Sequence, residues 1–283
     1  MKSLTLKLLT TISLLSISLF GNQEIDKSIL KYEESKISSI LKRQQIQLND
    51  VSIVLKKDLQ QDGWFGYVFN LTFTVKGKQL TQKDILFTNG DLITTELVNA
   101  KTNSSFKDKM YPTLADKYFN KTHLIAGNPN AKNSLVLFSD PLCPICLNEV
   151  PRIIKNVLDH PNSIALYYYH LPLDMHPTAK VLSKASMLAR KMGIKNVDYK
   201  IYTTNFGKFY DAYEEKDNQK ALTHFNEVFK TEITMEQINN PELETALKYD
   251  MDMSDEAFVE GTPTVFFNGE IDKSRTKYEQ YLK

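Results

Sequence analysis

The two cysteines of the chain lie close together, at Cys143 and Cys146, with Pro144 and Ile145 between them. Two thiols at this spacing can close into a small disulfide and open again, which transfers two electrons and two protons. The chain has no other thiol that could pair wrongly with them. Reversible thiol chemistry is therefore the first hypothesis for this pair.

Two other roles of a Cys-x-x-Cys pair fit the sequence less well. A structural zinc site needs four ligands, and neither a second cysteine pair nor a close pair of histidines on one helix face is available. A structural disulfide that closes so short a loop constrains the unfolded chain little. We therefore expect no metal, and no cofactor beyond the redox-active disulfide Cys143–Cys146 itself.

The residues around the pair predict a strand that leads directly into a helix. Leu135–Phe138 form a short apolar run, which is typical of a buried central strand. The free N–H groups and partial positive charge at a helix N-terminus favour thiolate over thiol. We expect Cys143 to be the exposed nucleophile and Cys146, one turn later, to be the buried resolving thiol. Apolar residues after the pair recur at helical spacing: Leu147, Val150, Ile153, Ile154, Val157 and Leu158.

Residues 1–21 have the pattern of a secretory signal peptide, with Lys2 and Lys7 before an uncharged apolar run. An uncleaved anchor is the alternative, because the cleavage site is weak. Removing this segment takes away two of the 35 basic residues and none of the 34 acidic ones, which leaves a net charge of −1. This balance gives no support for a nucleic-acid partner.

Residues 22–103 are expected to form an α+β N-terminal domain. Apolar residues at helical spacing predict a helix over 23 to about 48, and the pattern then changes to alternation, most clearly over 65–75. Turn signals at Asp62-Gly63 and Asn89-Gly90 indicate an antiparallel meander. A core of this size is marginal alone, so we expect self-association.

Residues 104–122 are expected to form a helical linker, with Ser105 and Asp108 resembling a capping box.

The remainder, 123–283, is expected to be an α/β domain. A second buried strand is predicted at 164–170, a helical insertion at about 176–257, a hairpin around Asn268-Gly269 and a terminal helix over 274–283.

Three motifs in this order resemble the exported bacterial thiol–disulfide oxidoreductases of the DsbA, DsbC and DsbG group, which have the thioredoxin fold. They are residues 138–146 (FSDPLCPIC), residues 171–179 (LPLDMHPTA) and residues 261–269 (GTPTVFFNG). The resemblance implies a cis peptide bond between Thr262 and Pro263. It also implies that these two residues bind an extended substrate strand beside Cys143.

The resemblance further implies a periplasmic protein that acts on exported proteins carrying thiols or disulfides. It implies an inner-membrane redox partner of DsbB or DsbD type. The layout of the N-terminal domain resembles the dimeric isomerases DsbC and DsbG, so the expected function is that of a homodimeric isomerase or reductase. A DsbA-like oxidase and a chaperone module with secondary redox activity are the alternatives.

Several neighbouring residues receive more ordinary interpretations. Asp140 is expected to cap the following helix, and His176 to serve in local packing or capping. The Tyr167–Tyr169 run is interpreted as strand core. Pro144-Ile145 offers no charge to stabilise a thiolate, so we predict that the pKa of Cys143 is lowered mainly by the helix terminus.

Overall fold

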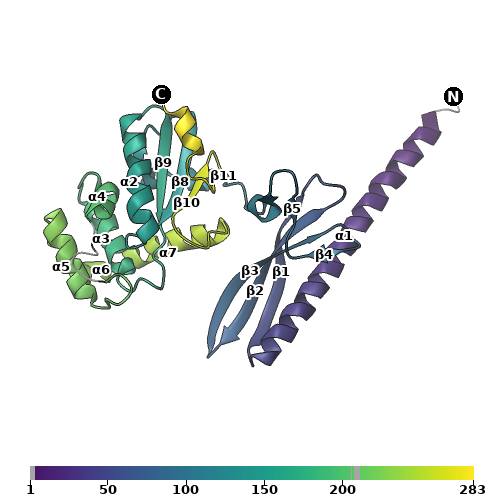
Figure 1. The fold of residues 1–283 in the computed structure, drawn as a ribbon, viewed down its shortest axis with the longest axis horizontal. Coiled ribbons are helices and arrows are strands. Elements are labelled where there is room, and N and C mark those ends of the chain that lie inside the picture. Colours follow the sequence, from purple (N-terminus) through teal and green to yellow (C-terminus); the bar gives the residue numbers. More distant parts are fainter. Residues whose placement is uncertain (1–3, 205, 207–210) are drawn as a thin grey trace. The chain divides into compact units, whose positions relative to one another are not determined.

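The computed structural model describes residues 4–204, 206 and 211–283, with only the backbone described for 4–22. The chain divides into two compact units, Met1–Met110 and Tyr111–Lys283, each considered separately below (Figure 1). The predicted signal peptide coincides with the first turns of helix α1 (Leu4–Arg43) and with residues that are not described. Within the described part of the chain, no helix is both long and apolar enough to cross a membrane.

The N-terminal unit combines α1 with an antiparallel sheet of order β1-β2-β3-β4, as the alternating pattern predicts. Its core joins Ile29 of the helix to Tyr67 and Phe69 of the second strand and to Leu86 of the third. The strands are β1 (Gln47–Asp58), β2 (Phe65–Val75), β3 (Lys78–Thr88) and β4 (Ile93–Thr94), followed by a two-stranded ribbon of β5 (Val98–Asn99) and β6 (Ser104–Ser105).

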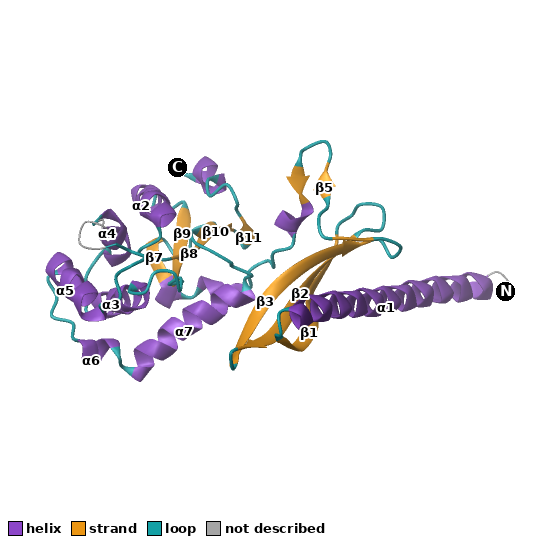
Figure 2. Ribbon diagram, turned by 60° about the horizontal axis from the view of Figure 1, so that its bottom comes forward, coloured by secondary structure: helices purple, strands orange, loops and turns teal. Residues whose placement is uncertain are grey.

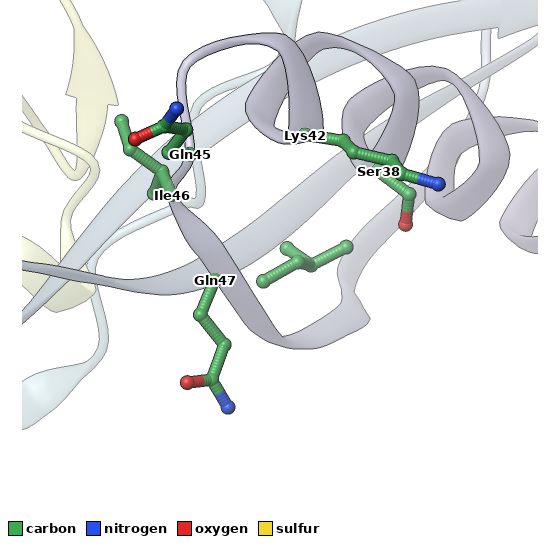
Figure 3. A pocket seen from close by; sticks show the side chains of 6 residues that line it. Ser38, Lys42, Gln45, Ile46 and Gln47 are labelled. Atoms are coloured by element: carbon green, nitrogen blue, oxygen red, sulfur yellow. The ribbon is translucent and has the colours of Figure 1, made fainter.

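Helix α1 ends five residues before the predicted end of the helix. It stops at Arg43 because Gln45 adopts a left-handed backbone conformation (φ 58°), and β1 begins at Gln47. Figure 3 shows this turn, where Ser38 and Lys42 of the helix face a shallow hollow beside residues 45–47. Leu48, which the helical pattern included, therefore lies in a strand.

The predicted helical linker over 104–122 is wrong. Those residues form the end of the β5–β6 ribbon and three short 3₁₀ helices, Phe106–Lys109, Asp116–Phe119 and Lys121–His123. Ser105 does cap the first of these, but its side chain accepts from the Lys107 amide, and no capping box with Asp108 forms. The boundary between the two units falls after Met110, inside the segment predicted as one element.

The C-terminal unit is built on a five-stranded sheet of order β11-β10-β8-β9-β7. Strands β8 and β9 are parallel, while β10 and β7 flank them antiparallel. The strands are β7 (Leu124–Gly127), β8 (Asn133–Ser139), β9 (Ile164–His170), β10 (Thr264–Phe267) and β11 (Glu270–Ile271). The parallel pair β8–β9 is connected by helix α2 (Pro144–Asp159), which is the crossover that such a pair requires.

The two faces of this sheet are covered by different helices (Figure 2). One face packs against α2 and the insertion helices α3 and α4, and the other packs against α7 and the segment containing Tyr118. The insertion between β9 and β10 consists of α3 (Ala179–Lys191), α4 (Val197–Thr203), α5 (Asn218–Phe229), α6 (Met235–Ile238) and α7 (Pro241–Glu256). Strands buried on both faces explain the nearly continuous apolar runs in the sequence.

Two further differences from the predicted elements are at the margins of the sheet. β7 has no clear sequence pattern, because it is a short edge strand that ends at Gly127 (φ 81°). A Cβ there would lie 1.8 Å from the Ile164 carbonyl oxygen, so this position requires glycine. The predicted terminal helix is a 3₁₀ helix limited to Lys277–Tyr281.

Candidate active site

The paired cysteines lie at the junction of β8 and α2, as the flanking residues predict. Cys143 is the N-cap of α2, with an extended backbone (φ −65°, ψ 123°), and Pro144 occupies the first turn. A first-turn proline loses no intrahelical hydrogen bond, because its N–H would have no partner there. The junction therefore directs the free amides of the helix N-terminus toward the Cys143 sulfur.

The two thiols differ in exposure, but both are more covered than expected. Cys143 is 6% exposed and Cys146 is fully buried, and both are free thiols. Cys143 is thus buried and not exposed as expected, although it is the more accessible of the two thiols. Ile145 between them is 52% exposed, so the apolar surface of the motif faces solvent.

A loop distant in sequence covers Cys143. The Thr262–Pro263 peptide bond is cis, as predicted, and the Cys143 sulfur lies 3.4 Å from the Thr262 carbonyl oxygen. Pro263 is buried directly before β10. The structure therefore brings all four predicted site residues together.

The electrostatic environment separates the two thiols strongly. A hydrogen bond from the Cys146 thiol is the largest contribution that lowers the pKa of Cys143, to about 5. The Thr262 side chain and the backbone amides of Ile145 and Cys146 lower the pKa of Cys143 further, against the opposing effect of burial. The direction of this shift agrees with the prediction, but its main cause is the second thiol and not the helix terminus.

Burial dominates the behaviour of Cys146. It raises the pKa of the Cys146 thiol well above its ordinary value, and the neighbouring Cys143 raises it further. Cys143 is therefore a thiolate at neutral pH, whereas Cys146 keeps its proton. A nucleophilic thiol must be deprotonated to attack, whereas a resolving thiol can stay protonated until the mixed disulfide has formed.

Asp140 does not cap α2, contrary to the prediction. One of its carboxylate oxygens accepts from the Leu142 amide (2.6 Å), and the other accepts from the Leu173 amide (2.7 Å) and lies 2.8 Å from His176 Nδ1. Both side chains are almost fully buried. The pair therefore connects the first two sequence motifs directly beneath the active site.

The His176 side chain interacts with both Asp140 and Cys143. Its hydrogen bond to Asp140 raises the pKa of the imidazole, and the negative charge of Cys143 raises it further. The attraction acts in both directions, so a protonated His176 favours the Cys143 thiolate. Its partner Asp140 lies 36 positions away, so no local sequence pattern indicates this pair.

Three hydroxyl groups beneath Cys146 were not identified from the sequence. A hydrogen bond from the Ser139 side chain lowers the pKa of Cys146 against the effect of burial. Ser139 accepts a 2.8 Å hydrogen bond from the Tyr202 hydroxyl, which lies 2.5 Å from the Tyr168 hydroxyl oxygen. Tyr168 does lie in the strand core, as predicted for the Tyr167–Tyr169 run. A serine at the end of an otherwise apolar buried strand is the one sequence signal for this arrangement.

The site has two thiols with oppositely shifted pKa values at a helix N-terminus, and a cis-proline loop lies beside them. Together with the sheet order β10-β8-β9, these features define a thioredoxin-fold protein of the thiol–disulfide oxidoreductase class. The family model described as "Thioredoxin" matches residues 119–283, more than half of the chain. The chain belongs to this family.

Solved structures resemble the chain over slightly more than half of its length. A thioredoxin-like oxidoreductase from Silicibacter pomeroyi is 20% identical and covers 56% of this chain and 87% of its own, with a TM-score of 0.45. A putative protein-disulfide isomerase from Pseudomonas syringae is 16% identical (53% and 89% covered, TM-score 0.47). BdbD from Bacillus subtilis is 18% identical (60% and 92% covered, TM-score 0.46).

One curated relative is much longer than this chain. A Na(+)/H(+) antiporter NhaA 3 of Salinispora tropica is 25% identical over 151 residues, which are 51% of this chain and 21% of that protein. The chain thus spans about a fifth of the length of this relative.

Proposed function

We propose that the protein catalyses thiol–disulfide exchange on exported proteins in the periplasm, with Cys143 as nucleophile and Cys146 as resolving thiol. The contrast between the two sulfurs carries the proposal: Cys143 has a pKa of about 5 and lies against the cis-proline loop, while Cys146 is fully buried with a raised pKa. The redox-active disulfide is the only cofactor that this reaction needs.

The reaction proceeds through a mixed disulfide. The Cys143 thiolate attacks one sulfur of a substrate disulfide, and the other substrate sulfur leaves as a thiolate. Either that thiolate rearranges the substrate and displaces Cys143, or Cys146 loses its proton and attacks the Cys143 sulfur. The second route oxidises the pair to a disulfide and releases the substrate with two thiols.

The cis-proline loop is the proposed substrate-binding element. Thr262 lies next to Cys143, and Pro263 offers no N–H that could continue a strand ladder. An extended substrate segment can then pair with the Thr262 backbone, which would place its disulfide against the Cys143 sulfur.

The preferred direction is isomerisation or reduction. The uncharged Pro144-Ile145 pair and the extra N-terminal unit support this choice. One observation favours the second candidate, a DsbA-like oxidase: a Cys143 pKa of about 5 stabilises the reduced protein and so makes the disulfide more oxidising. An inner-membrane partner of DsbD type would serve the first direction, and one of DsbB type the second.

One pair of assays separates these directions. The protein is incubated with a multi-disulfide substrate whose disulfides are scrambled and, separately, with the same substrate fully reduced. We expect recovery of native substrate from the scrambled form, and Cys143→Ser as control should recover none. Catalysed oxidation of the reduced form alone would establish the oxidase. Undiminished suppression of aggregation by a variant lacking both cysteines, with neither redox activity present in the wild type, would favour the chaperone module.

The N-terminal unit is the proposed dimerisation surface. Leu48, Phe73 and Leu80 lie in register across β1, β2 and β3, and Leu80 is 47% exposed. Such a row of apolar side chains at one end of a sheet is suited to contact with a second copy.

Replacing Leu80 by Asp is expected to weaken the dimer about tenfold or more, because a charge would have to be buried in the contact. Sedimentation velocity measures the change. Leu92→Asp is the matched control, since Leu92 is 63% exposed and lies off the row. A wild-type protein that sediments as a monomer at all accessible concentrations would contradict the proposed dimer.

A further inference from the structure

A chain of buried hydroxyl groups leads away from the Cys146 sulfur into the interior. Ser139 at the end of β8 hydrogen-bonds to Cys146, Tyr202 of α4 donates to the Ser139 Oγ at 2.8 Å, and the Tyr168 hydroxyl oxygen lies 2.5 Å from that of Tyr202. All four residues are at most 2% exposed. Each belongs to a different element of the C-terminal unit, so the chain depends on tertiary packing.

The far end of this chain approaches a buried carboxyl group. Asp198 lies one helical turn before Tyr202 on α4, on the same side of the helix. Its charge acts on Tyr168, and its Oδ1 lies 3.4 Å from Arg190 of α3. Asp198 and Arg190 also line a hollow on the outside of the unit, together with Asn196. Asp198 is itself buried, and its Oδ1 accepts no hydrogen bond among the described residues, so this carboxylate is an open acceptor at the wall of the hollow.

The Cys146 thiol needs such a route for its proton. It must lose a proton before it can attack the Cys143 sulfur, yet it is fully buried. The preceding residues of β8, Val136–Phe138, carry no acid. The Asp140 carboxylate is already engaged by two amides and by His176. The hydroxyl of Ser139 is thus the polar side chain available at this sulfur.

The groups around Asp198 suit it to hold a proton transiently. Burial raises the pKa of Asp198, and the negative charge of Asp250 on α7 raises it further, while Arg190 opposes both effects. His170 of β9 hydrogen-bonds to Arg190, and burial lowers the pKa of His170 so far that it stays neutral. The charge that acts directly on Cys146 is that of the Cys143 thiolate. His176 in turn interacts electrostatically with Cys143.

We infer that Ser139, Tyr202, Tyr168 and Asp198 form a proton relay that serves the buried Cys146 thiol. In the resting protein Tyr202 donates to Ser139 and Ser139 to Cys146, so the hydroxyl groups must first rotate to reverse these directions. When Cys146 then attacks, its proton passes to the Ser139 oxygen, the Ser139 proton to Tyr202, the Tyr202 proton to Tyr168 and the Tyr168 proton to the Asp198 carboxylate. One proton leaves the sulfur and one arrives at Asp198, from which it exchanges with solvent. Ser139 touches the reacting sulfur and is a catalytic residue, whereas the other three are positioning residues that act through it.

The inference rests on the proposed exchange reaction and deepens it, so the test must separate the two. The reduced protein is mixed with an aromatic disulfide reagent that releases one coloured thiolate when Cys143 attacks and a second when Cys146 resolves the adduct. The first phase reports the proposed nucleophile, and the second reports the relay. A wild-type protein without a first phase would overturn the proposed function itself.

Tyr202→Phe removes the middle hydroxyl and keeps the ring. We expect the rate of the second phase, relative to the first, to fall about tenfold or more, with a steeper rise toward high pH as hydroxide replaces the relay. Ser139→Ala, a smaller change at the sulfur, should give the same result even if Tyr202→Phe destabilises the fold. Tyr199→Phe on the same helix is the matched control and should leave both phases as in the wild type. A second phase with unchanged rate and pH profile in both Tyr202→Phe and Ser139→Ala would overturn the relay.

Discussion

Replacing Cys146 by Ser is expected to stop turnover and to leave the protein covalently attached to its substrates through Cys143. The resolving sulfur is lost, so the mixed disulfide can be released only by an external thiol. The nucleophile should stay reactive, because the serine hydroxyl can replace the Cys146 thiol as hydrogen-bond donor to the Cys143 sulfur. Adducts should therefore appear on non-reducing gels and disappear on reduction.

Cys146→Ala provides the control for this reasoning. It also lacks the resolving sulfur, but it removes the donor that contributes most to the low pKa of Cys143. The pKa of Cys143 should then rise toward about 8.5, the value of an unperturbed thiol, and adducts should form more slowly at neutral pH. Absence of adducts from the Cys146→Ser variant would rule out Cys143 as the nucleophile. Equal rates in the two variants would show that the Cys146 thiol does not lower the Cys143 pKa.

The reduced protein should gain stability over the oxidised protein as the pH rises. The pKa of Cys143 is about 5 in the fold, while an unfolded thiol titrates near about 8.5. Between these values the unfolded state binds the proton and the folded state does not, so the stability of the reduced form increases with pH and is lost as the pH falls through about 5. At pH 7 the contribution is about 3 kcal/mol, since Cys143 is almost fully buried.

Urea unfolding of both redox forms at about pH 4 and about pH 8 measures this difference. The difference between the forms cancels groups that titrate equally in both, such as Glu33, whose pKa burial raises to about 7. Above about pH 8.5 the gain from Cys143 should cease, because the unfolded Cys143 thiol then loses its proton as well. The stability of the reduced form should fall at higher pH, because the folded Cys146 keeps a proton that the unfolded Cys146 loses. A difference in stability that does not change with pH would contradict the low pKa of Cys143.

The sequence allowed the local arrangement of the site to be predicted. The strand before Cys143, the helix after it and the turn signals of the meander are read from neighbouring residues, and the structure has each of them. The cis bond at Thr262 was predicted from the resemblance of residues 261–269 to a known motif. These features depend on short-range pattern, which a sequence displays directly.

The environment of the thiols could not be predicted in the same way. Asp140 meets His176 across 36 positions, and Tyr202 meets Ser139 across 63. Neither spacing corresponds to a helix or strand period, so only the packing of α4 and the 171–178 loop on the sheet creates these pairs. The linker was mispredicted because Phe106 and Tyr118 are buried in different units, so their apolar spacing does not belong to one helix.

The helices between β9 and β10 also bear on how freely this domain can be recombined. Tyr202 and Asp198 belong to that insertion, whereas Ser139 and Tyr168 belong to the sheet. An insertion from a relative could restore the apolar contacts of α4 and still interrupt the hydroxyl chain. Exchanging insertions between thioredoxin-fold scaffolds would therefore preserve folding more readily than turnover, unless position 202 and its partner on the sheet were transferred together.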